Sequence, residues 1–177
     1  MLHYLAYGSN LHPLRLKERV PSAKLVGTVA LDGYRLAFHK RSIDASGKCN
    51  LLTSAGPSHR AYGAIFRIDE KHKNDLDRHE RVGKGYRHAH LHLRSNNESH
   101  SCFCYVADPN YVDDALLPYD WYTRLVVLGA EYLGMPAAYL DRIKRLETIP
   151  DPDAKRKAQN EELIRRIMAV NTGGFIR

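Results

Sequence analysis

The sequence has few cysteines and no long apolar run. No stretch of its 177 residues approaches the roughly 20 consecutive apolar residues of a membrane-spanning helix, so we expect no membrane association. The first residues enter an apolar strand directly, without the basic and apolar segments of a secretory signal. The cysteines are Cys49, Cys102 and Cys104. Their odd number and the spacing of the last two argue against a disulfide framework and favour a cytoplasmic protein.

The sequence also lacks internal repeats and low-complexity linkers, and its length is that of one domain. We expect residues 1–150 to form this domain and residues 151–177 to form a C-terminal helix and tail packed on it. The formal net charge of +7 makes nucleic acid a possible partner class. The basic residues 155–157 and 165–166 alternate with Glu161 and Glu162, which is more typical of a solvated helix face, so binding of nucleic acid is disfavoured.

Residue patterns predict a mixed chain in which strands come first and most helices come later. Strands are predicted over residues 3–7, 24–30, 34–39, 61–68, 86–94 and 101–107. Helices are predicted over residues 13–19, 70–80, 119–133, 136–147 and 153–170, with a loop-rich insert over residues 42–59. The strands follow one another too closely for repeated crossovers. We therefore predict an α+β fold, a small mixed and partly closed β-barrel with flanking helices, rather than a doubly wound sheet.

The segment Tyr7-Gly8-Ser9-Asn10 follows the first apolar strand, and Pro13 shortly after it suits the first turn of a helix. Gly8 permits a backbone turn that other residues resist, and Ser9 and Asn10 place short polar side chains beside exposed N–H groups. A strand that ends in such a turn before a helix can bind an anion such as a carboxylate. Ordinary turn chemistry is the alternative interpretation.

The helix predicted over residues 70–80 is polar along most of its length, and Leu76 is its apolar residue. Glu80 lies four residues later and therefore on the same side of the helix. A carboxylate that faces the core from this position is a candidate general base or acid. The alternative is a solvated glutamate at the end of a helix.

Further short motifs follow along the chain. In order they are Tyr7-Gly8-Ser9-Asn10-Leu11, Arg15, Pro21-Ser22-Ala23, Leu76-Asp77-Arg78-His79-Glu80, Gly85-Tyr86, Tyr105, Tyr122 and Leu128-Gly129-Ala130. In this order and spacing, from residue 3 to about residue 147, the sequence resembles the gamma-glutamyl cyclotransferase family. The resemblance implies a barrel-like fold with a pocket at one mouth, a cytosolic enzyme without metal or cofactor, and 5-oxoproline as product.

The resemblance also assigns roles to residues. Glu80 matches the catalytic position, and the substrate-binding residues that it implies are Leu5, Ala6, Tyr7, Gly8, Ser9, Asn10, Tyr105 and Tyr122. The implied substrate is a small gamma-glutamyl compound. The sequence leaves open whether the protein is a monomer or a homodimer. Arg81 departs from the family, which often has glycine there, and this leaves the identity of the leaving amine open.

Two alternatives stay open at this point. The first alternative is that the chain is not a cyclotransferase but a similar scaffold used as a basic binding module for nucleic acid or an acidic partner. The second is that it is a cyclotransferase that acts on a gamma-glutamylated biosynthetic intermediate rather than on free gamma-glutamyl compounds.

His88, His90 and His92 alternate along a predicted strand, where they share a face. We expect this to be an exposed polar face rather than a metal site, with Ala89, Leu91 and Leu93 turned to the core.

Overall fold

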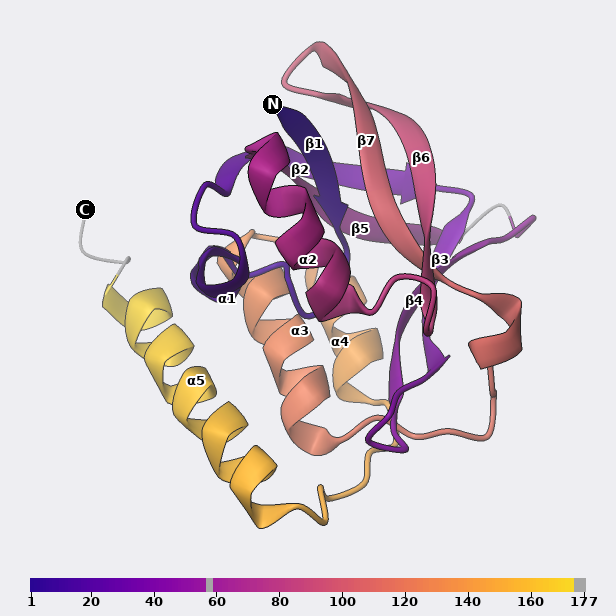
Figure 1. The fold of residues 1–177 in the computed structure, drawn as a ribbon, viewed down its shortest axis with the longest axis vertical. Helices are drawn as coiled ribbons and strands as arrows, with labels where there is room; N and C mark the ends of the chain where they lie inside the picture. Colours follow the sequence, from indigo (N-terminus) through magenta and orange to yellow (C-terminus); the bar gives the residue numbers. More distant parts are fainter. Residues whose placement is uncertain (57–58, 174–177) are drawn as a thin grey trace.

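The computed structural model describes residues 1–56 and 59–173. Its strands are β1 (Leu2–Ala6), β2 (Lys24–Asp32), β3 (Tyr34–Arg41), β4 (Gly47–Thr53), β5 (Arg60–Ile68), β6 (Tyr86–Ser95) and β7 (Glu98–Ala107). Its α-helices are α1 (Pro13–Arg19), α2 (Lys73–Glu80), α3 (Asp120–Tyr132), α4 (Ala137–Lys144) and α5 (Ala154–Gly173), as Figure 1 shows. Short 3-10 helices at Glu70–His72 and Pro109–Tyr111 precede α2 and follow β7.

Five strands form one sheet in the order β2-β5-β1-β7-β6, and β3 and β4 form a separate hairpin. Strand β1 lies at the centre, antiparallel to β5 and parallel to β7. The edges of the sheet approach each other through side chains: Ser95 Oγ donates to the Thr28 carbonyl at 3.2 Å, and Asn96 Nδ2 donates to that of Val26 at 3.0 Å. The α+β prediction is therefore confirmed, and among the described strands the sheet is not closed into a barrel by strand pairing.

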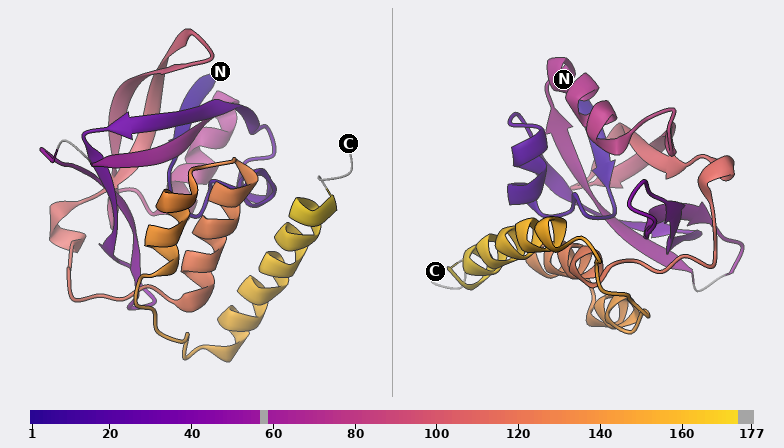
Figure 2. Two further views of the ribbon diagram at one scale, coloured as in Figure 1. Left: turned by 180° about the vertical axis from the view of Figure 1, so that it is seen from behind. Right: turned by 60° about the horizontal axis from the view of Figure 1, so that its bottom comes forward.

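The helices lie in two groups around the sheet. In Figure 1, α2 lies in front of β1 and α1 lies beside α2, whereas α3, α4 and α5 lie together below the sheet with α5 on the outside. Figure 2 shows this second group from behind and from below. Helix α5 packs through the buried side chains of Leu163, Ile164 and Ile167, and Asn171 contacts His12 at 3.1 Å. None of the helices in residues 1–56 and 59–173 is both long enough and apolar enough to cross a bilayer.

The segment predicted as a loop over residues 42–59 contains strand β4, and its residues 57 and 58 lie outside the described parts of the chain. The prediction of a loop was wrong for residues 47–53, because β4 pairs along β3 with Leu51 opposite Leu36. The turn between the two strands is closed by Asp44, which accepts hydrogen bonds from the Ser46 N–H at 3.1 Å and from Lys48 Nζ at 2.8 Å. Tertiary pairing therefore produces a strand that the sequence pattern does not indicate.

Candidate functional site

The turn after β1 places backbone donors at the centre of the fold. The Leu11 N–H donates to the Gly8 carbonyl at 3.0 Å and closes the turn, and Ser9 and Asn10 are buried within it. In the described parts of the chain, the N–H groups of Gly8 and Ser9 have no hydrogen-bond acceptor. Both residues line the small cavity described below, and binding of an anion by their N–H groups stays a prediction.

Position 8 needs a glycine because a side chain would not fit there, and not because the backbone has an unusual φ angle. It is not among the glycines with a positive φ, which corrects the expectation drawn from its turn. A Cβ atom at this position would lie 2.9 Å from Cβ of Cys49 and 3.1 Å from its Sγ. These distances are too short for ordinary contact, so the glycine lets the turn pack closely against β4.

Glu80 is the last residue of α2, and its side chain is directed toward the same turn. Leu76, one helical turn earlier, is fully buried, and the Glu80 side chain is 15% exposed. Its Oε1 accepts a hydrogen bond from Asn10 Nδ2 at 2.9 Å and one from Arg19 Nη1 at 3.0 Å. Glu80 is therefore not the solvated helix-end residue of the alternative interpretation.

Arg19, the last residue of α1, completes this arrangement. Its Nη1 also donates to Oδ1 of Asn10 at 2.9 Å, so one nitrogen holds both the amide and the carboxylate. Arg19 was not predicted from the sequence as a site residue. The available signal was its place as a basic residue at the end of the helix that follows the Tyr7–Asn10 turn.

A small cavity lies between this turn and Glu80, with a volume of about 30 Å³, which is room for about one water molecule. It is lined by Tyr4, Tyr7, Gly8, Ser9, Asn10, Cys49, Glu80, Tyr86, Tyr105 and Tyr122. The structure thus brings together most of the residues singled out in the sequence and adds Tyr4, Cys49 and Tyr86. Leu5 and Ala6 do not line the cavity. Both are fully buried within β1, and their assignment to substrate binding stays a prediction.

Two of the lining residues, Tyr86 and Tyr122, form hydrogen bonds with the backbone of Cys49 in β4. The Cys49 N–H donates to the Tyr122 hydroxyl at 3.1 Å, and the Tyr86 hydroxyl donates to the Cys49 carbonyl at 2.6 Å. Burial raises the pKa of both tyrosines well above the ordinary range, and it raises the pKa of the Cys49 thiol to about 12. These groups therefore stay neutral near pH 7 and shape the cavity rather than exchange protons there.

Tyr105 lines the cavity with its ring and is held from outside by Asp77. Its hydroxyl donates to Oδ1 of Asp77 at 2.7 Å, and its carbonyl accepts a short hydrogen bond from the Tyr7 hydroxyl. Desolvation opposes ionisation of Asp77, but hydrogen bonds from Lys73, His88 and Tyr105 hold its pKa below the usual value. The hydroxyl of Tyr105 is therefore already engaged in a hydrogen bond with Asp77.

The three histidines of β6 lie in different surroundings. His88 Nε2 lies 2.9 Å from Asp77, whereas His90 and His92 are exposed. The apolar residues between them, Ala89, Leu91 and Leu93, pack against the core as expected. In the part of the chain that the structure describes, no group of three or more His, Cys, Asp or Glu residues is arranged to hold a metal ion.

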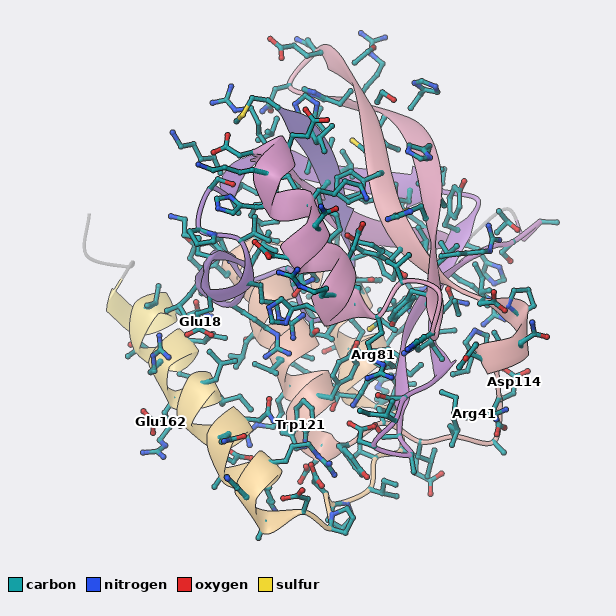
Figure 3. The ribbon with its side chains drawn as sticks, in the orientation of Figure 1. Glu18, Arg41, Arg81, Asp114, Trp121 and Glu162 are labelled. Carbon is teal, nitrogen blue, oxygen red and sulfur yellow. The ribbon has the colours of Figure 1, made fainter. Side chains whose placement is uncertain are left out.

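A second, wider hollow of about 160 Å³ adjoins the cavity. The two share Ser9, Glu80, Tyr86 and Tyr122 as lining residues. In Figure 3, Arg81 lies at the end of α2 and Trp121 lies below it at the start of α3, and both line this hollow. Glu80 therefore stands between a small inner cavity and a larger outer one.

The fold and the cavity define an α+β protein in which a strand–turn–helix segment meets a largely buried carboxylate. A solved structure described as gamma-glutamyl cyclotransferase matches this fold with a TM-score of 0.80 and 24% identity, over 93% of this chain and 98% of that chain. YkqA from Bacillus subtilis matches with a TM-score of 0.70 and 20% identity, over 84% of this chain and 56% of that one. These likenesses establish the fold.

Sequence comparisons agree with the structural ones. The sequence model of the AIG2-like family matches residues 60–143. The curated gamma-glutamylcyclotransferase of Homo sapiens is 26% identical over 173 residues, which cover 92% of this chain and 87% of the relative. That of Bos taurus is 26% identical and covers 89% of this chain and 84% of the relative. The chain is therefore similar to curated gamma-glutamylcyclotransferases and, over residues 60–143, to the AIG2-like family.

Proposed function

We propose that the protein is a gamma-glutamyl cyclotransferase. In the proposed reaction, the α-amino nitrogen of a gamma-glutamyl compound attacks the compound's own γ-carbonyl carbon and closes a five-membered lactam. The bond from this carbon to the attached amine breaks, which releases 5-oxoproline and a free amino acid or amine. The curated relatives that carry the name gamma-glutamylcyclotransferase support this proposal.

Glu80 is the group that we assign to proton transfer. It is the one carboxylate among the described residues that line the inner cavity, where the other ionisable groups are neutral tyrosines and the neutral Cys49 thiol. Glu80 takes the proton that the attacking amine loses and returns it to the leaving nitrogen. Asn10 and Arg19 act as positioning residues, because their hydrogen bonds fix the carboxylate beside the turn.

We assign the Gly8 and Ser9 N–H groups to the substrate's α-carboxylate. Fixing this carboxylate opposite Glu80 would bring the α-amino group and the γ-carbonyl together and lower the entropic cost of ring closure. A glutamyl group is larger than the 30 Å³ inner cavity, so binding requires the side chains at its mouth to move. The leaving amine then lies in the outer hollow on the far side of Glu80.

The alternative of a basic binding module finds little support in the last helix. Its arginines are paired with carboxylates: Arg156 contacts Asp151 at 2.5 Å, and Arg166 contacts Glu18 at 2.7 Å. A binding module also has no need for the contact between Glu80 and Asn10, which is the observation that carries the proposed enzymatic function.

The test is incubation of the purified protein with a panel of gamma-glutamyl dipeptides and gamma-glutamyl amines, scored for 5-oxoproline by mass spectrometry. We expect release of 5-oxoproline and of the free amine in equal amounts from at least one member. Treatment with EDTA should leave the rate unchanged. Absence of 5-oxoproline from every member of the panel, with folded protein, would overturn the proposal.

A further inference from the structure

The outer hollow beside Glu80 collects positive charge from several elements. Five of its lining side chains are cationic: Arg15 and Arg19 of α1, Lys40 of β3, Lys48 of β4, and Arg81 after α2. The carboxylates that line it are those of Asp44 and Glu80. The hollow is therefore positively charged although it lies next to the proposed catalytic carboxylate.

Both carboxylates are already paired with a cation. Glu80 contacts Arg19 at 3.0 Å, and Asp44 contacts Lys48 at 2.8 Å. For the remaining three cations, the described residues provide no carboxylate oxygen within 4.0 Å. The positive charge of Arg15, Lys40 and Arg81 is thus not compensated by ion pairs of the protein itself.

Two of these cations are buried, which makes the lack of a counter-charge significant. Arg15 is 8% exposed and Lys40 is 3% exposed. Arg15 Nε is buried with no hydrogen-bond partner in residues 1–56 and 59–173, and Lys40 Nζ lies 4.4 Å from the centre of the Tyr86 ring. Desolvation lowers the pKa of Arg15 to about 9 and also lowers that of Lys40. A buried charge without a partner is unfavourable, and a bound anion would relieve this cost.

The position of the hollow identifies which part of a ligand it would hold. It shares Glu80 and Ser9 with the inner cavity. A substrate whose α-carboxylate is bound by the Gly8 turn and whose γ-carbonyl is beside Glu80 would direct its leaving amine into this hollow. Arg81, which also lines the hollow, is exposed to solvent.

We propose that the hollow binds a leaving amine with more than one carboxylate, so that the preferred substrate is a gamma-glutamyl derivative of an acidic amino acid. This inference rests on the proposed function and narrows its substrate class. Charge-assisted hydrogen bonds from Arg15, Lys40 and Arg81 would recognise the two carboxylates of the leaving group. A neutral leaving side chain of the same size would leave part of this charge unpaired.

The first test compares gamma-glutamyl-glutamate with the isosteric gamma-glutamyl-glutamine. We expect kcat/KM to be higher for the glutamate compound by roughly tenfold or more, and the ratio to fall as salt is added. Lys40→Met and Arg81→Gly should each bring the ratio closer to one. Lys84→Met is the matched control, because Lys84 is an exposed cation near Arg81 that does not line the hollow. Arg81 is exposed, so its variant tests the proposal even where Lys40→Met fails to fold.

The second test measures binding of free L-glutamate and L-glutamine by calorimetry, without turnover. We expect glutamate to bind more tightly than glutamine and the difference to shrink in Lys40→Met and Arg81→Gly. Equal turnover of the two dipeptides together with equal binding of the two amino acids would overturn the inference while the cyclotransferase proposal stands. If no compound yields 5-oxoproline, the proposed function fails, and selective binding of glutamate that depends on Lys40 or Arg81 still supports the anionic site.

Discussion

The amide of Asn10 and the carboxylate of Glu80, which are 70 residues apart in the chain, are joined by a 2.9 Å hydrogen bond. Asn10 belongs to the turn after the central strand β1, whereas Glu80 ends α2. Asn10 Nδ2 also lies 3.0 Å from the Tyr4 hydroxyl, so the amide is held from both sides. This contact joins the proposed anion-binding turn to the proposed proton-transfer group and underlies the first predictions.

Glu80→Gln tests the proposed catalytic residue. The amide retains the shape of the carboxylate and an oxygen that accepts from Asn10 and Arg19, but it cannot take up a proton. We expect kcat to fall by about 10² or more with a small change in KM. Asp75→Asn is the control, because Asp75 is a half-buried carboxylate of the same helix that lines neither cavity, and this change should leave both constants unchanged. Turnover of Glu80→Gln close to that of the unmodified protein would exclude this role.

Arg19→Met tests the positioning of Glu80. Loss of the two hydrogen bonds from Nη1 should reduce kcat/KM by roughly tenfold. Lys17→Met, an exposed cation on the same helix, is the control. Lower stability of Arg19→Met with an unchanged kcat/KM would show that Arg19 has only a structural role.

The sequence predicted those parts of the site that depend on local spacing. The Tyr7–Asn10 turn follows a recognisable strand, and the four-residue interval from Leu76 to Glu80 fixes the side of the helix on which the glutamate lies. Tyr122 lies within the helix predicted over residues 119–133, and its side chain is buried. These inferences need only the geometry of one element.

The residues that were missed are brought to the site by pairing between elements. Cys49 belongs to β4, which carries the polar residues Lys48 and Asn50 and therefore does not resemble a buried strand. The side chain of Asn50 can be buried because both of its polar atoms have partners: Nδ2 lies 3.0 Å from His39, and Oδ1 accepts a hydrogen bond from the Ala107 N–H at 2.8 Å. Such satisfaction of buried polar groups depends on tertiary structure and leaves no periodic signal in the sequence.

Gly8→Ala tests the close packing of the turn against β4. The added Cβ would meet the buried Cys49 side chain, so either the turn or the strand must shift. We expect a loss of about 1–3 kcal/mol in the free energy of unfolding, measured in urea, together with reduced turnover. Gly83→Ala is a useful comparison, because no atom lies within 4 Å of the position of its added Cβ and only its positive φ opposes the change. A neutral effect of Gly8→Ala on stability would contradict this packing argument.

Arg81 has the left-handed conformation, with φ 56° and ψ 50°, at the end of α2. This conformation explains why a glycine suits the position. Arg81→Gly should therefore be more stable than Arg81→Ala by about 1 kcal/mol, because alanine keeps the strain and glycine relieves it. At Arg78, inside the helix, the order should reverse, and the glycine variant should be less stable than the alanine variant by about 1 kcal/mol. Urea unfolding of the four variants measures both differences, and the same order at the two sites would contradict the argument.

The buried cysteines should cause the free energy of unfolding to decrease at alkaline pH. Burial raises the pKa of Cys49 to about 12, that of Cys102 to about 11 and that of Cys104 to about 12. The folded state thus retains thiol protons that the unfolded chain loses near pH 8.5–9. The free energy of unfolding is unaffected below that range and falls as pH rises from about 9 toward 11, by about 1.4 kcal/mol per pH unit for each thiol.

Urea unfolding between pH 8 and pH 10 tests this dependence. We expect a constant midpoint up to about pH 8.5 and a decrease above it, with a shallower slope in Cys102→Ala because one titrating thiol is removed. The native thiols should also react slowly with a disulfide reagent at pH 8 and rapidly after unfolding in urea, because all three are buried and neutral. Rapid reaction of the folded protein, or a midpoint that rises between pH 9 and pH 10, would show that the thiols are not held in the protonated state by burial.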